Sequence, residues 1–100
     1  MTDEKCLAVL HLYQNRLKEI DGRCVEADYD GKLPTDHTAF AHLMSMIPKM
    51  EEFIKNGKRE KFFRWLGFMQ GVLWSFGEFS LNELRDHNRP PEEPFRPPNK

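Results

Sequence analysis

The sequence predicts an all-α fold: a small helical bundle with a long N-terminal helix, a kinked helical hairpin and a short C-terminal helix. Three long segments place apolar side chains at spacings of three and four, which is typical of helices with one buried face. Gly22 and Gly57 stand where two of these segments end, and glycine is favoured just after a helix. No segment alternates between apolar and polar residues as a half-buried strand would.

The length of 100 residues indicates one domain, which we assign to residues 1–88. Five prolines in residues 89–100 predict an extended, flexible tail. The net charge of −1 excludes a globally basic nucleic-acid-binding protein. The N-terminus is polar, and no apolar run approaches the roughly 20 residues of a membrane span. We therefore expect a cytoplasmic protein that makes no membrane contact.

The first helix is expected over residues 2–21, with Thr2 as its N-cap. Residues 22–35 form an acidic connector whose glycine and proline content argues against a helix. Val25 and Tyr29 are the side chains that we expect to anchor it. The predicted buried stripe of the first helix consists of Leu7, Leu10, Tyr13, Leu17 and Ile20.

The second and third helices are expected over residues 36–56 and 58–76, antiparallel because only Gly57 separates them. Pro48 should kink the second helix, since proline removes a backbone hydrogen bond. A fourth helix over residues 81–87 begins with a capping box of Ser80 and Glu83. The predicted core face of the third helix consists of Phe62, Trp65, Leu66, Met69, Gln70, Val72, Leu73 and Phe76.

Basic side chains crowd the turn before the third helix, where the helix dipole favours acids instead. The free N–H groups at a helix N-terminus would add to these charges and favour a phosphate-bearing ligand. The alternative is a solvated charged turn in which Glu60 and Arg64 form an ordinary pair four residues apart. The candidate anion-binding residues are Lys58, Arg59, Lys61 and Arg64.

A stripe of small residues follows on the third helix, formed by Gly67, Gly71 and Ser75, with Phe68 beside it. Each interior glycine costs roughly 1 kcal/mol relative to alanine. Close approach of another backbone would offset that cost. The approaching group is another helix of this chain, a second copy that makes a homo-oligomer, or a flat ligand.

Other reactive side chains predict no catalytic or metal site. Cys6 and Cys24 lack metal-ligand spacing and are expected to be buried thiols in a reducing compartment. Gln70 lies within an apolar arc and needs a partner on a neighbouring helix or on the connector. The four histidines form no metal-ligand set or catalytic pairing. We therefore expect a protein that is not an enzyme and has no cofactor.

Residues 64–74 read Arg-Trp-Leu-Gly-Phe-Met-Gln-Gly-Val-Leu-Trp. This segment resembles a helix of short proteins from tailed bacteriophages and prophages, a family with no established activity. The resemblance extends over residues 42–90 and includes the His-Leu-x-x-Met pattern at residues 42–46 and the Glu-Leu-Arg-Asp-His-Asn-Arg-Pro ending at residues 83–90. It implies a phage protein acting in the cytoplasm of an infected bacterium.

The turn Arg59-Glu60-Lys61, ahead of a helix containing Trp74, is also similar to phage sponge proteins that sequester cyclic nucleotide signals of bacterial immunity. That resemblance implies that Arg59, Lys61 and Arg64 contact ligand phosphates and that Tyr13 stacks on a base. It favours a non-enzymatic anti-defence protein that binds a cyclic oligonucleotide. The alternative is a protein-interaction module that inhibits a host defence protein or nuclease, through the surface of the third helix or through the acidic connector.

Overall fold

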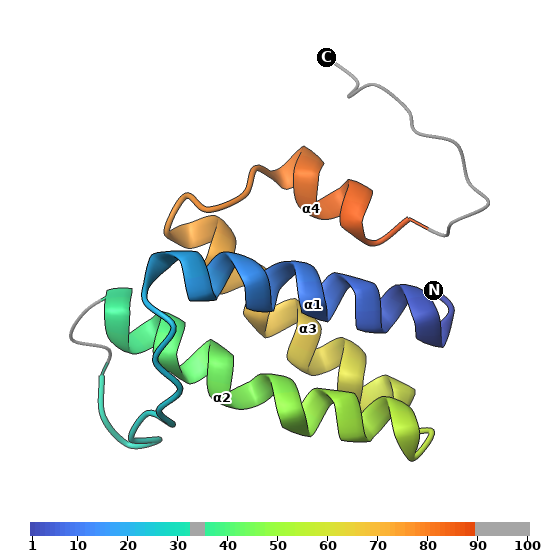
Figure 1. Cartoon of the computed structure of the whole chain (residues 1–100), viewed down its shortest axis with the longest axis horizontal. Helices are drawn as coiled ribbons and strands as arrows, with labels where there is room; N and C mark the ends of the chain where they lie inside the picture. Colours follow the sequence, from blue (N-terminus) through green and yellow to red (C-terminus); the bar gives the residue numbers. More distant parts are fainter. Residues whose placement is uncertain (33–35, 90–100) are drawn as a thin grey trace.

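The computed structural model describes residues 1–32 and 36–89, which contain four α-helices and no strand. The helices are α1 (Asp3–Ile20), α2 (Asp36–Lys55), α3 (Arg59–Ser75) and α4 (Leu81–His87). In Figure 1, α1 lies between α4 and α2, with α3 behind it. The all-α prediction is confirmed. Apart from Arg89, the predicted tail lies outside the described residues.

The ends of the long helices follow the predicted capping signals. The Thr2 hydroxyl accepts a hydrogen bond from the backbone N–H of Lys5 at 3.1 Å. Gly57 follows α2 with a φ of +71°, and the N–H of Lys58 donates to the Phe53 carbonyl at 2.8 Å. This left-handed glycine reverses the chain, so α2 and α3 form the expected antiparallel hairpin. Pro48 lies inside α2, and the helix continues through it.

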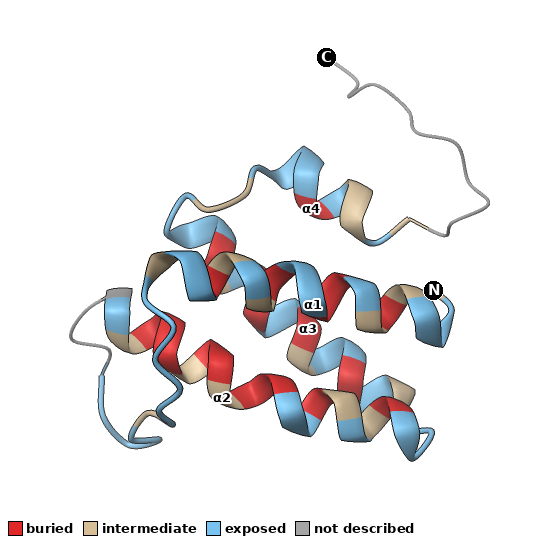
Figure 2. Ribbon diagram, in the orientation of Figure 1, coloured by how far each residue is buried: buried red, intermediate tan, exposed pale blue. Residues whose placement is uncertain are grey.

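The core lies between α1 and the α2–α3 hairpin, where the buried residues of the three helices face one another (Figure 2). Cys6 is buried as expected, but Cys24 is exposed on the connector. Phe76 was expected in the core and is 40% exposed. It follows the last residue of α3, where the backbone leaves the helical path that the predicted core face assumes. The fully buried large side chains are Tyr13, Phe62, Leu10, Leu17, Leu43, Ile47, Met50, Met69 and Leu73.

A polar cluster joins α1, α3 and the end of α4. The Gln70 amide donates to the Tyr13 hydroxyl at 2.9 Å and to the Asn88 side-chain oxygen at 2.8 Å. Asn88 donates back to Gln70 at 3.1 Å, and the Tyr13 hydroxyl lies 2.8 Å from Nδ1 of His87. Among the described residues, no buried side-chain nitrogen or oxygen lacks a partner. The expected partner of Gln70 on a neighbouring helix is therefore Tyr13.

The acidic connector crosses α2 and is held by its backbone. The N–H of Val25 donates to the Ala41 carbonyl at 3.1 Å, and the N–H of Ala27 donates to Nδ1 of His42 at 3.1 Å. The side chains of Val25 and Tyr29 were expected to anchor this segment, but they are 59% and 74% exposed. For Val25 that expectation was wrong, because its backbone N–H and not its side chain makes the attachment; Tyr29 keeps an edge contact of its ring with His42 of α2.

Candidate functional site

A shallow basic hollow of about 420 Å³ lies at the tip of the α2–α3 hairpin. No side chain caps the N-terminus of α3, and its first helical hydrogen bond runs from the N–H of Phe62 to the Lys58 carbonyl. The preceding N–H groups of α3 are therefore left at the positive end of the helix dipole. The hollow is lined by Gly57, Lys58, Arg59, Glu60, Lys61 and Arg64, which include all four predicted anion-binding residues.

Two of the four predicted cations already have partners within the chain. Arg59 donates to the Asp3 carboxylate and the Met1 carbonyl, and its guanidinium lies 5.3 Å from the Phe63 ring centre. The Lys61 ammonium lies 5.0 Å from the ring centre of Phe53. Arg59 thus ties the start of α3 to the start of α1, an interaction that the sequence did not suggest.

Lys58 and Arg64 are the cations of the basic hollow that are exposed and uncommitted. Within residues 1–32 and 36–89, neither forms an ion pair. The Glu60–Arg64 pair expected for a solvated charged turn is therefore not formed among the described residues, whereas the exposure of these side chains is compatible with either a solvated turn or an anion site. A bound anion would meet two cations that form no ion pair among the described residues, together with one carboxylate, that of Glu60, which lines the same hollow.

Tyr13 cannot stack on a ligand, so that part of the prediction was wrong. Its side chain is fully buried, and its ring packs against Phe79 and His87 at centroid distances of 5.4 Å each. Burial raises the pKa of the Tyr13 hydroxyl to about 12, which keeps it neutral in the polar cluster. The spacing of Tyr13 from Leu10 and Leu17 predicts a place on the buried stripe of α1, and this prediction is the one that the structure confirms.

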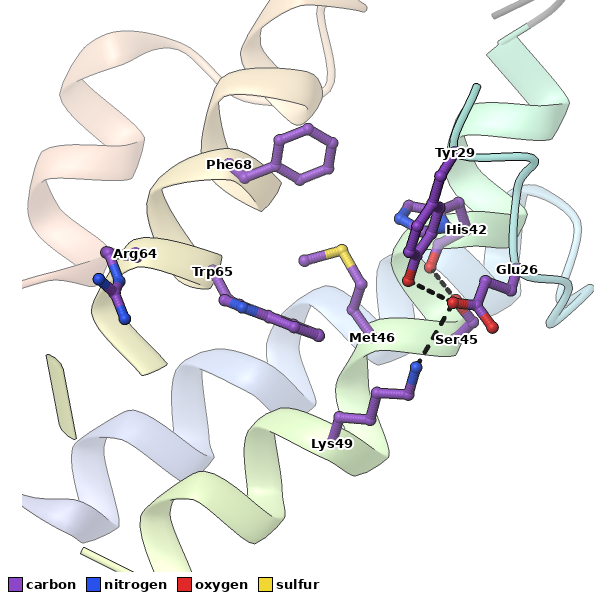
Figure 3. A pocket seen from close by; sticks show the side chains of 9 residues that line it. All are labelled: Glu26, Tyr29, His42, Ser45, Met46, Lys49, Arg64, Trp65 and Phe68. Carbon is purple, nitrogen blue, oxygen red and sulfur yellow. Dashed lines mark hydrogen bonds and ion pairs between the residues drawn. The ribbon is translucent and has the colours of Figure 1, made fainter. Parts of the chain in front are cut away.

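An aromatic groove of about 470 Å³ lies beside the basic hollow, and Arg64 lines both. Figure 3 shows Phe68 and Trp65 on α3 facing Tyr29 of the connector and His42 of α2 across Met46. The His42 ring makes edge contacts with both Tyr29 and Phe68, at centroid distances of 6.1 and 6.2 Å. The groove is lined by Glu26, Tyr29, His42, Ser45, Met46, Lys49, Arg64, Trp65 and Phe68.

The polar groups on the connector side of the groove satisfy one another. The Tyr29 hydroxyl donates to the Glu26 carboxylate, and the Lys49 ammonium lies 3.5 Å from the same carboxylate. The Tyr29 hydrogen bond, followed by the Lys49 charge, lowers the pKa of Glu26 below its ordinary value. Glu26 is therefore ionised at neutral pH and offsets the charge of Lys49, which leaves Arg64 as the uncompensated charge of the groove.

Most of this groove was missed from the sequence. A signal was present on α2, where His42, Ser45, Met46 and Lys49 follow the spacing of one helix face. Arg64, Trp65 and Phe68 likewise lie within one turn of α3. The position of Tyr29 had no such signal, because it depends on where the connector crosses α2.

The small-residue stripe of α3 faces outward and borders a hollow of about 550 Å³, which we call the outer hollow. A Cβ atom added at Gly67 or Gly71 would meet nothing within 4 Å. Close packing against another helix of the same chain, one of the three expected explanations, is therefore wrong. The outer hollow is lined by Gly67, Phe68, Gly71, Val72, Trp74, Ser75 and Phe76.

Metal-ligand clusters and membrane-spanning helices are both absent from the described residues. No group of three His, Cys, Asp or Glu side chains in residues 1–32 and 36–89 is placed to hold a metal ion. Over the same ranges, no helix combines the length and apolar character needed to cross a bilayer. Comparisons with protein-family models, curated proteins and solved structures give no match.

Proposed function

We propose that this protein binds and sequesters an anionic nucleotide through the basic hollow, without chemical conversion of the ligand. The observation that carries the proposal is the pairing of the uncapped N-terminus of α3 with the uncommitted cations Lys58 and Arg64. Backbone N–H groups at a helix N-terminus and nearby cations are the usual ligands of a phosphate group. A ligand with several phosphates would use both cations at once.

The resemblance to phage proteins supports a biological setting for this activity. A protein that captures a cyclic oligonucleotide signal would protect a phage in the cytoplasm of its host. In this proposal Lys58 and Arg64 supply the main charge, and Lys61 can join them by leaving the Phe53 ring. Arg59 has a structural part, since its guanidinium joins α3 to Asp3 and the Met1 carbonyl.

Thermal unfolding with a panel of linear and cyclic di- and trinucleotides tests the proposal. A ligand that binds only the folded protein stabilises it by about 2.7 kcal/mol at a hundredfold excess over Kd. We expect one class of nucleotide to raise Tm and the double variant Lys58→Ala/Arg64→Ala to abolish the shift. Lys18→Ala/Lys32→Ala, which removes two exposed cations elsewhere, is the matched control. No shift with any nucleotide, or an equal shift in both variants, would contradict the proposal.

A second candidate function is a protein-interaction module that uses the outer hollow. Its support is the exposed surface of α3, where Gly67 and Gly71 have no neighbour and Phe68 and Trp74 are 54% and 50% exposed. The occupant is a second copy of this chain, which forms a homo-oligomer, or a host defence protein. Apolar surface of this kind often marks an interaction site.

Sedimentation equilibrium shows whether the outer hollow binds a second copy of this chain, because only that occupant makes the purified protein self-associate. If a second copy binds here, Gly71→Leu should reduce self-association, because the new side chain fills the outer hollow. Ala8→Leu places the same side chain at an exposed site on α1 and should leave self-association unchanged. A monomeric wild-type protein would exclude the homo-oligomer.

A further inference from the structure

We infer that the aromatic groove is a binding site for a nucleobase, and that it orients the base so that its phosphates lie at Arg64. This inference rests on the proposed function and adds a site for the base of the nucleotide, since the basic hollow would bind only its phosphates. Tyr13 is buried, so the ligand finds no stacking partner on α1. The groove offers aromatic rings immediately beside the basic hollow instead.

The walls of the groove present aromatic surface that the chain leaves uncovered. Phe68 and Tyr29 stand on opposite sides of the groove and are among the most exposed aromatic residues of the described chain. Trp65 continues the wall along α3, and Met46 is buried beneath it (Figure 3). A flat ring placed between these walls would contact aromatic faces, a sequence-tolerant mode of binding nucleic-acid bases.

The charges around the groove give the bound nucleotide a direction. Glu26 and Lys49 lie together on the connector side, so that side offers no net positive charge to a phosphate. Arg64 lies on the α3 side, lines both cavities and has no ion pair within residues 1–32 and 36–89. A nucleotide therefore fits with its base near Tyr29 and its phosphates toward Arg64 and Lys58.

His42 adds a directional donor to the groove. Its Nδ1 accepts from the N–H of Ala27, so in the neutral ring the proton is on Nε2. That N–H belongs to a residue lining the groove and can donate to a ring nitrogen or carbonyl oxygen of a base. A purely apolar occupant, such as a leucine side chain of a partner protein, would leave both this donor and Arg64 unused.

Tryptophan fluorescence gives a direct test, because the two tryptophans lie in different cavities. Trp65 lines the aromatic groove, whereas Trp74 lines the outer hollow. The variant Trp74→Phe leaves Trp65 as the only tryptophan. We would titrate this protein with ATP, adenosine and inorganic triphosphate. We expect ATP and adenosine to quench Trp65 and triphosphate to leave its emission unchanged.

Calorimetry on paired variants then assigns the base to the groove. Phe68→Ala should weaken ATP binding by about tenfold or more, because loss of one base–aromatic stack has effects of that order. Its affinity for inorganic triphosphate should not change. Phe76→Ala removes an exposed phenylalanine directly after α3, outside the groove, and is the matched control that should leave ATP affinity unchanged.

The outcomes separate this inference from the proposed function. If ATP and triphosphate bind equally and Phe68→Ala has no effect, the nucleobase site is wrong while anion binding at the basic hollow stands. If neither ATP nor adenosine affects Trp65, the nucleobase site is also overturned. The proposed function is then decided independently by the nucleotide panel and the Lys58→Ala/Arg64→Ala variant.

Discussion

The side of α3 that faces the core carries a buried polar residue, and the side that faces outward carries two glycines; both are unfavourable in a helix. Only on the inner, core-facing side do contacts within the chain offset this cost. On the inner side, the Gln70 amide is buried and bonds to Tyr13 and Asn88. On the outer side, Gly67 and Gly71 meet nothing within 4 Å. The contrast teaches that the buried polar residue of the inner side contributes to folding, whereas the described residues place nothing against the two outer glycines.

The largest expected effect comes from Tyr13→Phe on the inner side. The change removes one hydroxyl and leaves a Gln70 N–H and Nδ1 of His87 without their partner. Since unsatisfied buried polar groups are costly, we expect the free energy of unfolding to fall by roughly 1–3 kcal/mol. Urea denaturation measures it.

Tyr29→Phe is the control for that experiment, because it removes a hydroxyl from an exposed tyrosine. We expect a change within about 0.5 kcal/mol, as for most surface substitutions. Equal losses in the two variants would show that the buried hydroxyl of Tyr13 contributes no more to stability than an exposed one, and would contradict the part in folding assigned to the inner side of α3.

A smaller effect is expected from pH, through His87 in the same polar cluster. Burial lowers the pKa of His87 below its ordinary value, although Glu83 acts in the opposite direction. The unfolded state therefore binds the proton more tightly. The stability contribution of neutral His87 is complete above the ordinary histidine pKa of about 6.5 and is lost as pH falls below it.

Urea midpoints between about pH 7.5 and 5.5 check this expectation, because that range spans the ordinary histidine pKa. The midpoint of the wild-type protein should fall across the range. His87→Gln should flatten the curve, since the groups around His87, namely Glu83, Lys5 and Asp86, remain in place. Parallel curves for the two proteins would assign the pH dependence to other groups.

The smallest effect is a gain, and it concerns the outer side. Gly71→Ala adds a methyl group into open space and should raise stability by about 1 kcal/mol, the difference in helix propensity. Thermal melting at low and high protein concentration measures it. A loss of stability confined to the high concentration would show that a second copy covers Gly71 and would remove the contrast between the two sides.

The helices could be predicted closely because their signals are local. Thr2, Gly57 and the Ser80–Glu83 capping box each act within a few residues, so the elements they bound lie within one residue of expectation. Gln70 was likewise predictable, since a lone amide in an apolar arc must find a partner. The predicted burial of Phe76 was wrong because the periodic pattern was extended one residue past the end of α3.

The candidate site could be predicted only in part. The basic residues of the hollow all lie within residues 58–64, so their proximity could be predicted correctly from the sequence. The sequence did not show that Arg59 would reach Asp3, 56 residues away, and so become engaged in the fold. The groove depends on Tyr29 reaching the face of α2, which is set by the path of a segment without a periodic pattern.

The way the connector is attached to α2 has a consequence for how this protein can change. The donors that hold it are the N–H groups of Val25 and Ala27, which every amino acid except proline supplies. Exchange of an exposed side chain such as Cys24 therefore leaves these two hydrogen bonds in place. Exchange of Tyr29 removes only its contacts with His42 and Glu26. One wall of the groove is free to vary while the helices stay fixed, so new ligand preferences can arise by substitution at the connector without loss of the fold.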